Sequence, residues 1–212
     1  MQFDLKQFPT ELAILDLPGM ILLPRGHLPL HLTENKYKLL IEDILKSDRY
    51  VGVVQTDSRI EGEKLFRSGC LGKITTFSEG DNGDYFIIVS GLCRFNLSTP
   101  LVTSKPYLVH SVSYETFSFD IYEERENETE REKLLNLVKA YFSSANLLAN
   151  WDEIKTASNE RLISSLTLLC PFDPEEKQAL LESPTLIERT RMMTALLEIA
   201  FLRNSQTSWF KH

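Results

Sequence analysis

The spacing of apolar residues changes near residue 120, and this change limits the possible folds more than any other feature of the chain. Before that point, runs with alternating apolar residues lie between turn signals such as Pro18-Gly19 and Asn82-Gly83, a pattern typical of β-strands. After it, apolar residues recur every three or four positions, as in amphipathic helices. The pattern predicts a β-rich domain over residues 1–120 and an α-helical domain over residues 121–212.

The first part is expected to contain several short strands and one early helix. The helix begins with Thr33 as N-cap, extends to about Ser47 and buries Tyr37, Leu40 and Ile44 on one face. Short strands with few helices favour a closed or nearly closed β-barrel. The strands are predicted at 11–17, 27–32, 50–56, 69–79, 84–98 and 107–119, with a polar loop at 57–68.

The second part is predicted to form a small helical bundle, so the fold class is α+β. Helices are expected over 131–144, 158–170 and 174–182, and a last helix follows Ser183-Pro184. Asp173, Pro174 and Glu176 have the spacing of a capping box at the third of them. The tail around Trp209-Phe210 has three interpretations: it frays, docks on the bundle, or contacts a partner.

The stretch His27–Leu32 alternates, with Leu28, Leu30 and Leu32 on one face and His27, Pro29 and His31 on the other. Pro29 has no N–H, so this strand is expected at a sheet edge. On a strand, residues four apart are about 13 Å apart, too far for His27 and His31 to share one metal ion. No metal and no cofactor are expected.

The chain has 23 Lys and Arg against 30 Asp and Glu, a formal net charge of −7. An acidic chain disfavours nucleic-acid binding, which relies on phosphate neutralisation. The acidic run at 123–130 is interpreted as a solvated helix start or linker. The apolar run around 20–32 is broken by prolines and Arg25, so no membrane span is expected.

Three cysteines, Cys70, Cys93 and Cys170, favour a reducing, cytoplasmic compartment over a disulfide framework. A hairpin turn centred on Asp81-Asn82 would place Cys70 opposite Cys93. The alternative turn at Asn82-Gly83 would place Cys93 opposite Gly72. In both cases the thiols are expected to be buried and inert.

Eight aromatic residues of the first part form a second group of interest. Aromatic side chains on a sheet can stack bases, but without a basic groove beside them core packing is the better interpretation. They are Phe77, Tyr85, Phe86, Phe95, Tyr107, Tyr114, Phe117 and Phe119.

Residues 17–40, LPGMILLPRGHLPLHLTENKYKLL, carry a family resemblance. The segment resembles the start of the N-terminal, substrate-binding domain of Lon proteases: Pro-Gly, three aliphatics, Pro, and then Leu-Pro-Leu-x-Ile-Phe-Glu-Pro-Arg-Tyr. Two later strands, Gly69 to Ile74 and Val89 to Phe95, are similar to family strands, and residues 168–182 resemble the helical extension of stand-alone bacterial members. The resemblance covers about residues 10–200.

The resemblance implies a PUA-like β pseudo-barrel followed by helices, and a non-catalytic role in binding polypeptide. It implies no enzyme, because the chain contains neither a Walker A loop nor a Ser–Lys peptidase domain. The sequence departs from the family pattern at Leu15-Asp16, at Arg25 in place of a common Gly, and at Thr33-Glu34-Asn35-Lys36 in place of Phe-Glu-Pro-Arg. Two aromatic positions that could grip unfolded chains are thereby lost.

Two hypotheses about function follow. The first is a cytoplasmic module that binds unfolded or apolar polypeptide segments, as an adaptor or chaperone-like factor working with a protease or chaperone, with strand addition at His27–Leu32 as one route. The second is a small-ligand or enzyme site in a groove between barrel and helical bundle. The residues predicted for a binding site are Arg25, His27, His31, Glu34, Tyr37 and Arg94.

Overall fold

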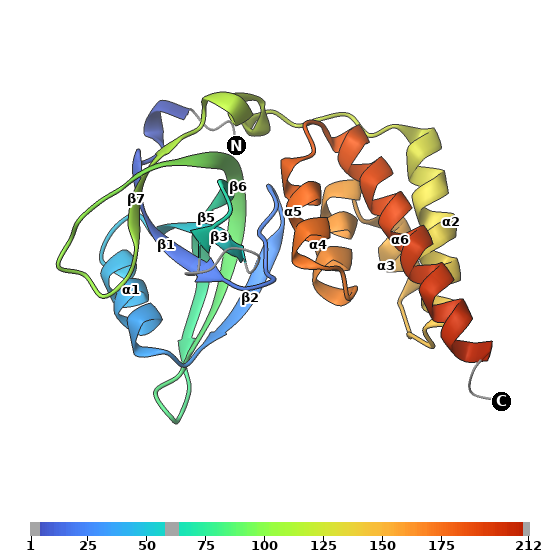
Figure 1. Ribbon diagram of the computed structural model, residues 1–212, viewed down its shortest axis with the longest axis horizontal. Helices are drawn as coiled ribbons and strands as arrows, with labels where there is room; N and C mark the ends of the chain where they lie inside the picture. The colour runs from blue at the N-terminus through green and yellow to red at the C-terminus, as the bar shows by residue number, and fades with distance from the viewer. Residues whose placement is uncertain (1–4, 58–63, 210–212) are drawn as a thin grey trace. The chain divides into compact units, whose positions relative to one another are not determined.

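The computed structural model describes residues 5–57 and 64–209. By its internal contacts the chain divides into two compact units, one of residues 1–123 with 173–181 and one of residues 124–172 with 182–212. The α+β class predicted from the sequence is confirmed (Figure 1). Phe210 of the predicted aromatic tail lies outside the described residues.

Seven strands within the described residues of the first unit form its framework. Five of them pair in a closed ring in the order β1-β7-β6-β5-β3, which returns to β1 through a parallel pairing of β1 with β3. β2 pairs with β6 and β4 pairs with β3, both outside this ring. The strands are β1 (Glu11–Leu17), β2 (His27–Leu32), β3 (Tyr50–Asp57), β4 (Lys64–Leu65), β5 (Ser68–Glu79), β6 (Tyr85–Pro100) and β7 (Val109–Ser113).

Two predictions for the first part, one of a strand and one of a loop, need correction or refinement. The strand predicted at 107–119 is wrong in its second half, because β7 ends at Ser113 and the 3-10 helix η2 (Glu115–Ile121) follows. This turn of helix carries Asp120 into the interior, where the side chain binds Arg94. The loop predicted at 57–68 contains β4, whose two residues extend the pairing with β3.

Three other helical elements belong to the first unit. They are the 3-10 helix η1 (Leu5–Gln7), α1 (Asn35–Leu45) and α5 (Pro174–Glu182), of which residues 174–181 are assigned to the unit. The predicted buried face of α1 is confirmed, but its N-cap is Glu34 and not Thr33, and no side chain caps it. One of the two hydrogen bonds of the predicted capping box of α5 is present, from the Asp173 N–H to Glu176 Oε2 at 2.9 Å.

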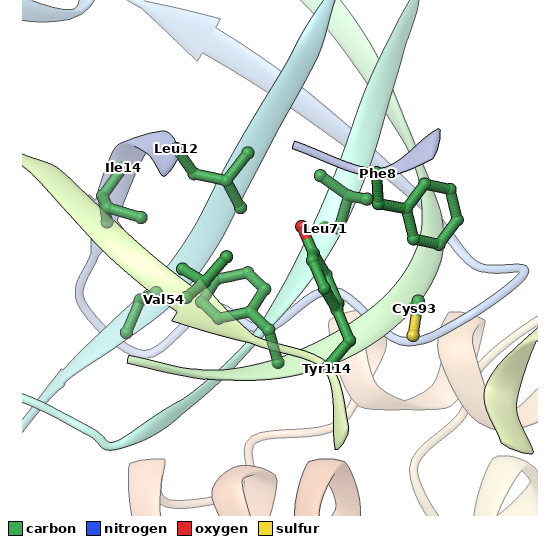
Figure 2. Close-up of a cluster of buried hydrophobic side chains, with 9 residues drawn as sticks. Phe8, Leu12, Ile14, Val54, Leu71, Cys93 and Tyr114 are labelled. Carbon is green, nitrogen blue, oxygen red and sulfur yellow. The ribbon is translucent and has the colours of Figure 1, made fainter. Parts of the chain in front are cut away.

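Aromatic and aliphatic side chains fill the inside of the ring (Figure 2). Phe95 and Leu71 are fully buried, and the rings of Phe8 and Tyr114 lie 5.5 Å apart. Burying a side chain of this size contributes about 1.5–3 kcal/mol. The core interpretation is therefore confirmed for Phe95, Tyr114 and Phe117, all less than a tenth exposed.

The connection from β1 to β2 lies against β6. Its residues Ile21, Leu22 and Leu23 are buried. Gly91 of β6 permits this contact, because a Cβ there would lie 2.1 Å from the Leu23 carbonyl oxygen.

The hairpin of β5 and β6 has neither of the two registers considered from the sequence. Cys93 lies opposite Leu71, and Cys70 lies opposite Arg94. The reason is a three-residue loop at 81–83, with Gly83 at φ 73° and a hydrogen bond from the Gly83 N–H to the Gly80 carbonyl. Two bulges further along the hairpin shift the pairing in opposite senses. All three cysteines are buried, and none forms a disulfide within the described residues.

The second unit is helical. Its helices are α2 (Glu128–Ser144), α3 (Trp151–Thr156), α4 (Asn159–Leu169) and α6 (Leu186–Trp209), and α2 packs against α6. The sequence patterns missed α3, which has six residues and none of them buried. The N-terminus of α6 is capped by Thr185, whose hydroxyl accepts from the Glu188 N–H at 3.2 Å.

The length and apolar character of the described helices show whether any of them could cross a membrane. None of them combines the length and the apolar character that crossing a bilayer requires.

Candidate functional site

The six residues predicted for a binding site occupy three separate places in the first unit. Arg94 and Arg25 lie near Asp120, Tyr37 and Glu34 lie at the start of α1, and His27 and His31 lie on the exposed side of β2. No single site unites them.

Arg94 is fully buried and forms an ion pair with Asp120. Its Nε donates to Asp120 Oδ2 at 2.9 Å, its Nη2 to Oδ1 at 2.6 Å, and its Nη1 to the Leu181 carbonyl at 2.9 Å. The ring of Phe117 lies 4.5 Å from the guanidinium carbon. Arg94 thus binds both a carboxylate and a backbone carbonyl. These contacts connect β6, η2 and α5, so we interpret Arg94 as a structural residue.

Arg25 ties the β1–β2 connection to the end of η2. Its Nη2 donates to the carbonyls of Asp120 and Tyr122, at 3.1 and 2.6 Å. Its backbone has φ 59°, in the left-handed region that glycine adopts most easily. The position therefore keeps the backbone conformation that the Gly of the family pattern would favour, although the residue differs.

Tyr37 and Glu34 have different environments at the start of α1. Tyr37 is buried, and its hydroxyl donates to the Asp16 carbonyl at 2.7 Å, while Glu34 is exposed. Lys36 Nζ lies 3.1 Å from Asp16 Oδ2. Two positions that depart from the family pattern, Asp16 and Lys36, therefore pair with each other.

The two histidines of β2 bind different partners. His27 Nδ1 lies 2.9 Å from Ser90 Oγ, and His31 Nε2 lies 3.1 Å from Asp84 Oδ2. The His31 ring also stacks on Phe86, with centroids 4.4 Å apart and planes 1° from parallel. His31 and Lys38 hydrogen bond to Asp84 and hold the pKa of that carboxyl below its usual value. Among the described residues, no three His, Cys, Asp or Glu side chains gather as a metal ion would require.

His31 lines an open groove on the outer side of three strands. The groove has a volume of about 350 Å³, and no Lys, Arg, Asp or Glu is among its eight lining residues. Phe86, on the middle strand β6, is 45% exposed. We call this groove the outer groove. Its lining residues are Pro29, Leu30 and His31 of β2, Thr76 and Ser78 of β5, and Phe86, Ile87 and Ile88 of β6.

Strand register explains why these side chains meet. His31 lies opposite Phe86, which in turn lies opposite Ser78 on β5. One row further along, Pro29 lies opposite Ile88 of β6. Alternate residues of paired strands share one face of a sheet, so these rows make one continuous surface.

Sequence reasoning missed most of the outer groove. Phe86 was expected in the core together with Phe77, but both are exposed by more than a third. The signal was available: in the run 85–90 the residues alternate, and Ile87 and Val89 take the buried face, which places Phe86 and Ile88 on the other.

A second groove lies in the helical unit, between α3 and α4. It has a volume of about 470 Å³, and Phe142, Leu162 and Leu166 are among its lining residues. Leu148 at its border is fully exposed. Unlike the outer groove, it includes charged residues, Glu153 and Arg161.

The buried cysteines do not offer a nucleophile. Burial raises the pKa of the Cys93 thiol to about 12 and that of Cys70 well above its ordinary value. A thiol that stays protonated is a poor nucleophile. The expectation of buried, inert thiols is consistent with this.

Comparison with known proteins gives one family. The family model described as the ATP-dependent protease La (LON) substrate-binding domain matches residues 11–198. Lon protease 2 of Myxococcus xanthus is 31% identical over 91% of this chain, and the Lon protease of Anaeromyxobacter dehalogenans is 29% identical over 91%. The chain spans about a quarter of the length of these relatives (24% and 23%).

Two solved structures have a similar fold. The N-terminal domain of the Lon protease of the Mycobacterium avium complex has a TM-score of 0.66 at 16% identity, over 89% of this chain and 98% of that chain. A Lon N-terminal domain protein from Xanthomonas campestris has a TM-score of 0.64 at 18% identity, over 88% of this chain and 98% of that chain.

Proposed function

Because this chain belongs to the family of Lon substrate-binding domains, we propose that it is a polypeptide-binding module and that the outer groove is its binding surface. The observation that carries the proposal is the uncharged lining of this groove, with the exposed ring of Phe86, in a chain of net charge −7. Exposed apolar surface whose lining residues include no Lys, Arg, Asp or Glu suits the uncharged, apolar segments that unfolded proteins expose.

The proposed activity is binding without catalysis. In this proposal the chain acts in the cytoplasm as an adaptor or chaperone-like factor, and presents bound segments to a protease or chaperone. The comparisons support the substrate-recognition part, since the matched family model is that of a substrate-binding domain.

We favour polypeptide over a small-molecule substrate because the residues predicted for the alternative site do not converge. Arg94 is fully buried against Asp120, while His27 and His31 lie on the outer side of β2. A catalytic site requires such groups within hydrogen-bond reach of one substrate.

The test is binding of a denatured model protein to the immobilised chain. Phe86→Ser and Ile88→Thr are expected to weaken binding about tenfold each, because a central apolar contact typically contributes more than 1 kcal/mol. Val102→Ser is the matched control, since Val102 is fully exposed in the loop before β7 and away from the groove lining.

Two results would contradict the proposal. Equal binding by the Phe86 and Val102 variants would remove the outer groove as the site. Loss of binding on Leu148→Ser alone would move the site to the groove of the helical unit.

A further inference from the structure

β2 is an edge strand of the first unit. All six of its residues pair with β6, with no bulge, and no other strand in the described part of the chain pairs with it. The closed ring has no free edge, but the sheet extends beyond it: β2 forms one edge of this extension, and residues 76–79 of β5, which pair with β6 alone among the described strands, form the other.

Two hydrogen bonds define which backbone groups of β2 face outward. The Gly91 N–H donates to the Gly26 carbonyl at 2.9 Å, which directs Gly26 toward β6. Since N–H and C=O directions alternate along a strand, Leu28, Leu30 and Leu32 also face β6, and the residues between them face away. The bond from Thr75 Oγ1 to the Ile88 carbonyl, at 3.2 Å, agrees, because it directs Ile88 toward β5 and not β2.

The open edge therefore presents three carbonyls but only two N–H groups. The carbonyls belong to His27, Pro29 and His31, and Pro29 has no N–H to offer. An antiparallel strand pairing with these three residues could make five of the six hydrogen bonds of a full ladder.

A second copy of β2 is a poorer partner than an unrelated strand. The sequence His27-Leu28-Pro29-Leu30-His31 reads the same in both directions, so a symmetric antiparallel pairing centres on Pro29. In that pairing the two Pro29 residues lie opposite each other. Neither has an N–H to donate to the carbonyl of the other, so four of the six backbone hydrogen bonds remain. The two proline rings also point toward each other's carbonyls.

Resting on the proposed function, we propose that the open edge of β2 binds an extended, uncharged segment of another polypeptide as an added strand. Pro29 disfavours pairing between two copies of this chain while it leaves the edge open to such a segment. Side chains on one face of the added strand would continue the surface of the outer groove, which explains the preference for uncharged segments.

The first experiment measures binding of a synthetic peptide of alternating Val and Thr, N-methylated at one amide at a time. Methylation of amides that face β2 is expected to weaken binding about fivefold, since one net hydrogen bond contributes about 1 kcal/mol. Methylation of the amides between them should leave affinity unchanged. We therefore expect the affinity to fall when every second amide along the peptide is methylated, and to stay the same for the amides between them.

Two other outcomes of this experiment are distinguishable. Binding with an equal response at every position would overturn strand addition and leave the proposed function in place. No binding of any peptide, together with no binding of denatured protein, would overturn both.

The second experiment restores the missing N–H. Pro29→Thr is expected to tighten peptide binding about fivefold and to increase self-association in sedimentation measurements. Pro106→Thr, in the exposed loop before β7, is the matched control and should change neither. An unchanged affinity and an unchanged oligomeric state for Pro29→Thr would overturn the proposed role of Pro29.

A further pair of variants separates backbone from side chain. His31→Pro removes an outward N–H and leaves the pairing with β6 intact, so it should weaken peptide binding about fivefold relative to His31→Ala. Equal affinity of these two variants would contradict strand addition.

Discussion

At the scale of single residues, the ion pair of Arg94 and Asp120 has the largest expected effect on stability. Asp120→Asn removes the carboxylate that pairs with the buried guanidinium, and breaking a buried ion pair from one side typically costs about 3–5 kcal/mol. The double variant Arg94→Met/Asp120→Leu should recover most of this loss, because no charge remains buried. Urea unfolding of the three proteins measures both effects; a double variant less stable than Asp120→Asn would contradict the explanation.

His110 gives a prediction about pH. Burial lowers the pKa of this histidine, and its Nδ1 has no hydrogen-bond partner among the described residues. In the unfolded chain the pKa of this histidine is near 6.5, and in the folded protein it is lower. Between these two values the unfolded state binds more protons than the folded state, so the free energy of unfolding falls as the pH falls. His110→Leu should therefore gain stability relative to the wild type between pH 7.5 and 5.5. A stability difference that stays constant with pH would show that His110 does not cause the change.

Single residues also show what the sequence could and could not predict about the site. The faces of His27, Pro29 and His31 were predictable, because alternation along a strand is a local property. The partners of Arg25 and Arg94 were not, since Asp120 is distant in sequence and reaches them only because η2 replaces the end of a predicted strand.

At the scale of elements, the acidic run at 123–130 has a structural role that charge alone did not reveal. Glu124 Oε2 accepts from the Leu186 N–H at the start of α6, and Glu126 Oε1 accepts from the Asn159 N–H at the start of α4. A carboxylate at a helix N-terminus satisfies a free N–H and interacts favourably with the helix dipole.

We therefore expect Glu124→Gln and Glu126→Gln to lower the free energy of unfolding by about 0.5–2 kcal/mol each. Glu123→Gln makes the same charge change at an exposed neighbour and should have little effect. Thermal unfolding of the three variants measures the difference. Equal losses in all three would indicate that net charge, and not capping, is responsible.

The register of the β5–β6 hairpin marks the limit of prediction for elements. Both strands were predictable from the alternation of apolar residues. The presence of a turn between them was predictable from Asn82-Gly83. The pairing of Cys93 with Leu71 was not, because it depends on a three-residue loop and two bulges, and a shift of one residue changes every opposed pair.

At the scale of the whole molecule, α5 belongs to the strand-containing unit although it lies among helices in the sequence. Gln55 Nε2 donates to the Pro174 carbonyl at 2.8 Å, Gln178 Nε2 to the Ser68 carbonyl at 3.2 Å, and Lys177 Nζ to the Gly19 carbonyl at 2.8 Å. Periodicity predicts that a helix buries one face, but it does not say against which element, so this assignment could not be made from sequence.

These contacts lead to a prediction for native-state hydrogen exchange in increasing urea. The amides of Leu180 and Leu181 should exchange with the same opening free energy as those of β5 and β6, since elements that pack together open together. Asp120→Asn should lower protection in α5 and in β6 in parallel, and leave Leu134 of α2 much less affected, because Asp120 holds Arg94, which donates to Leu181. Protection in α5 that followed α2 instead would place this helix in the folding unit of the helical part.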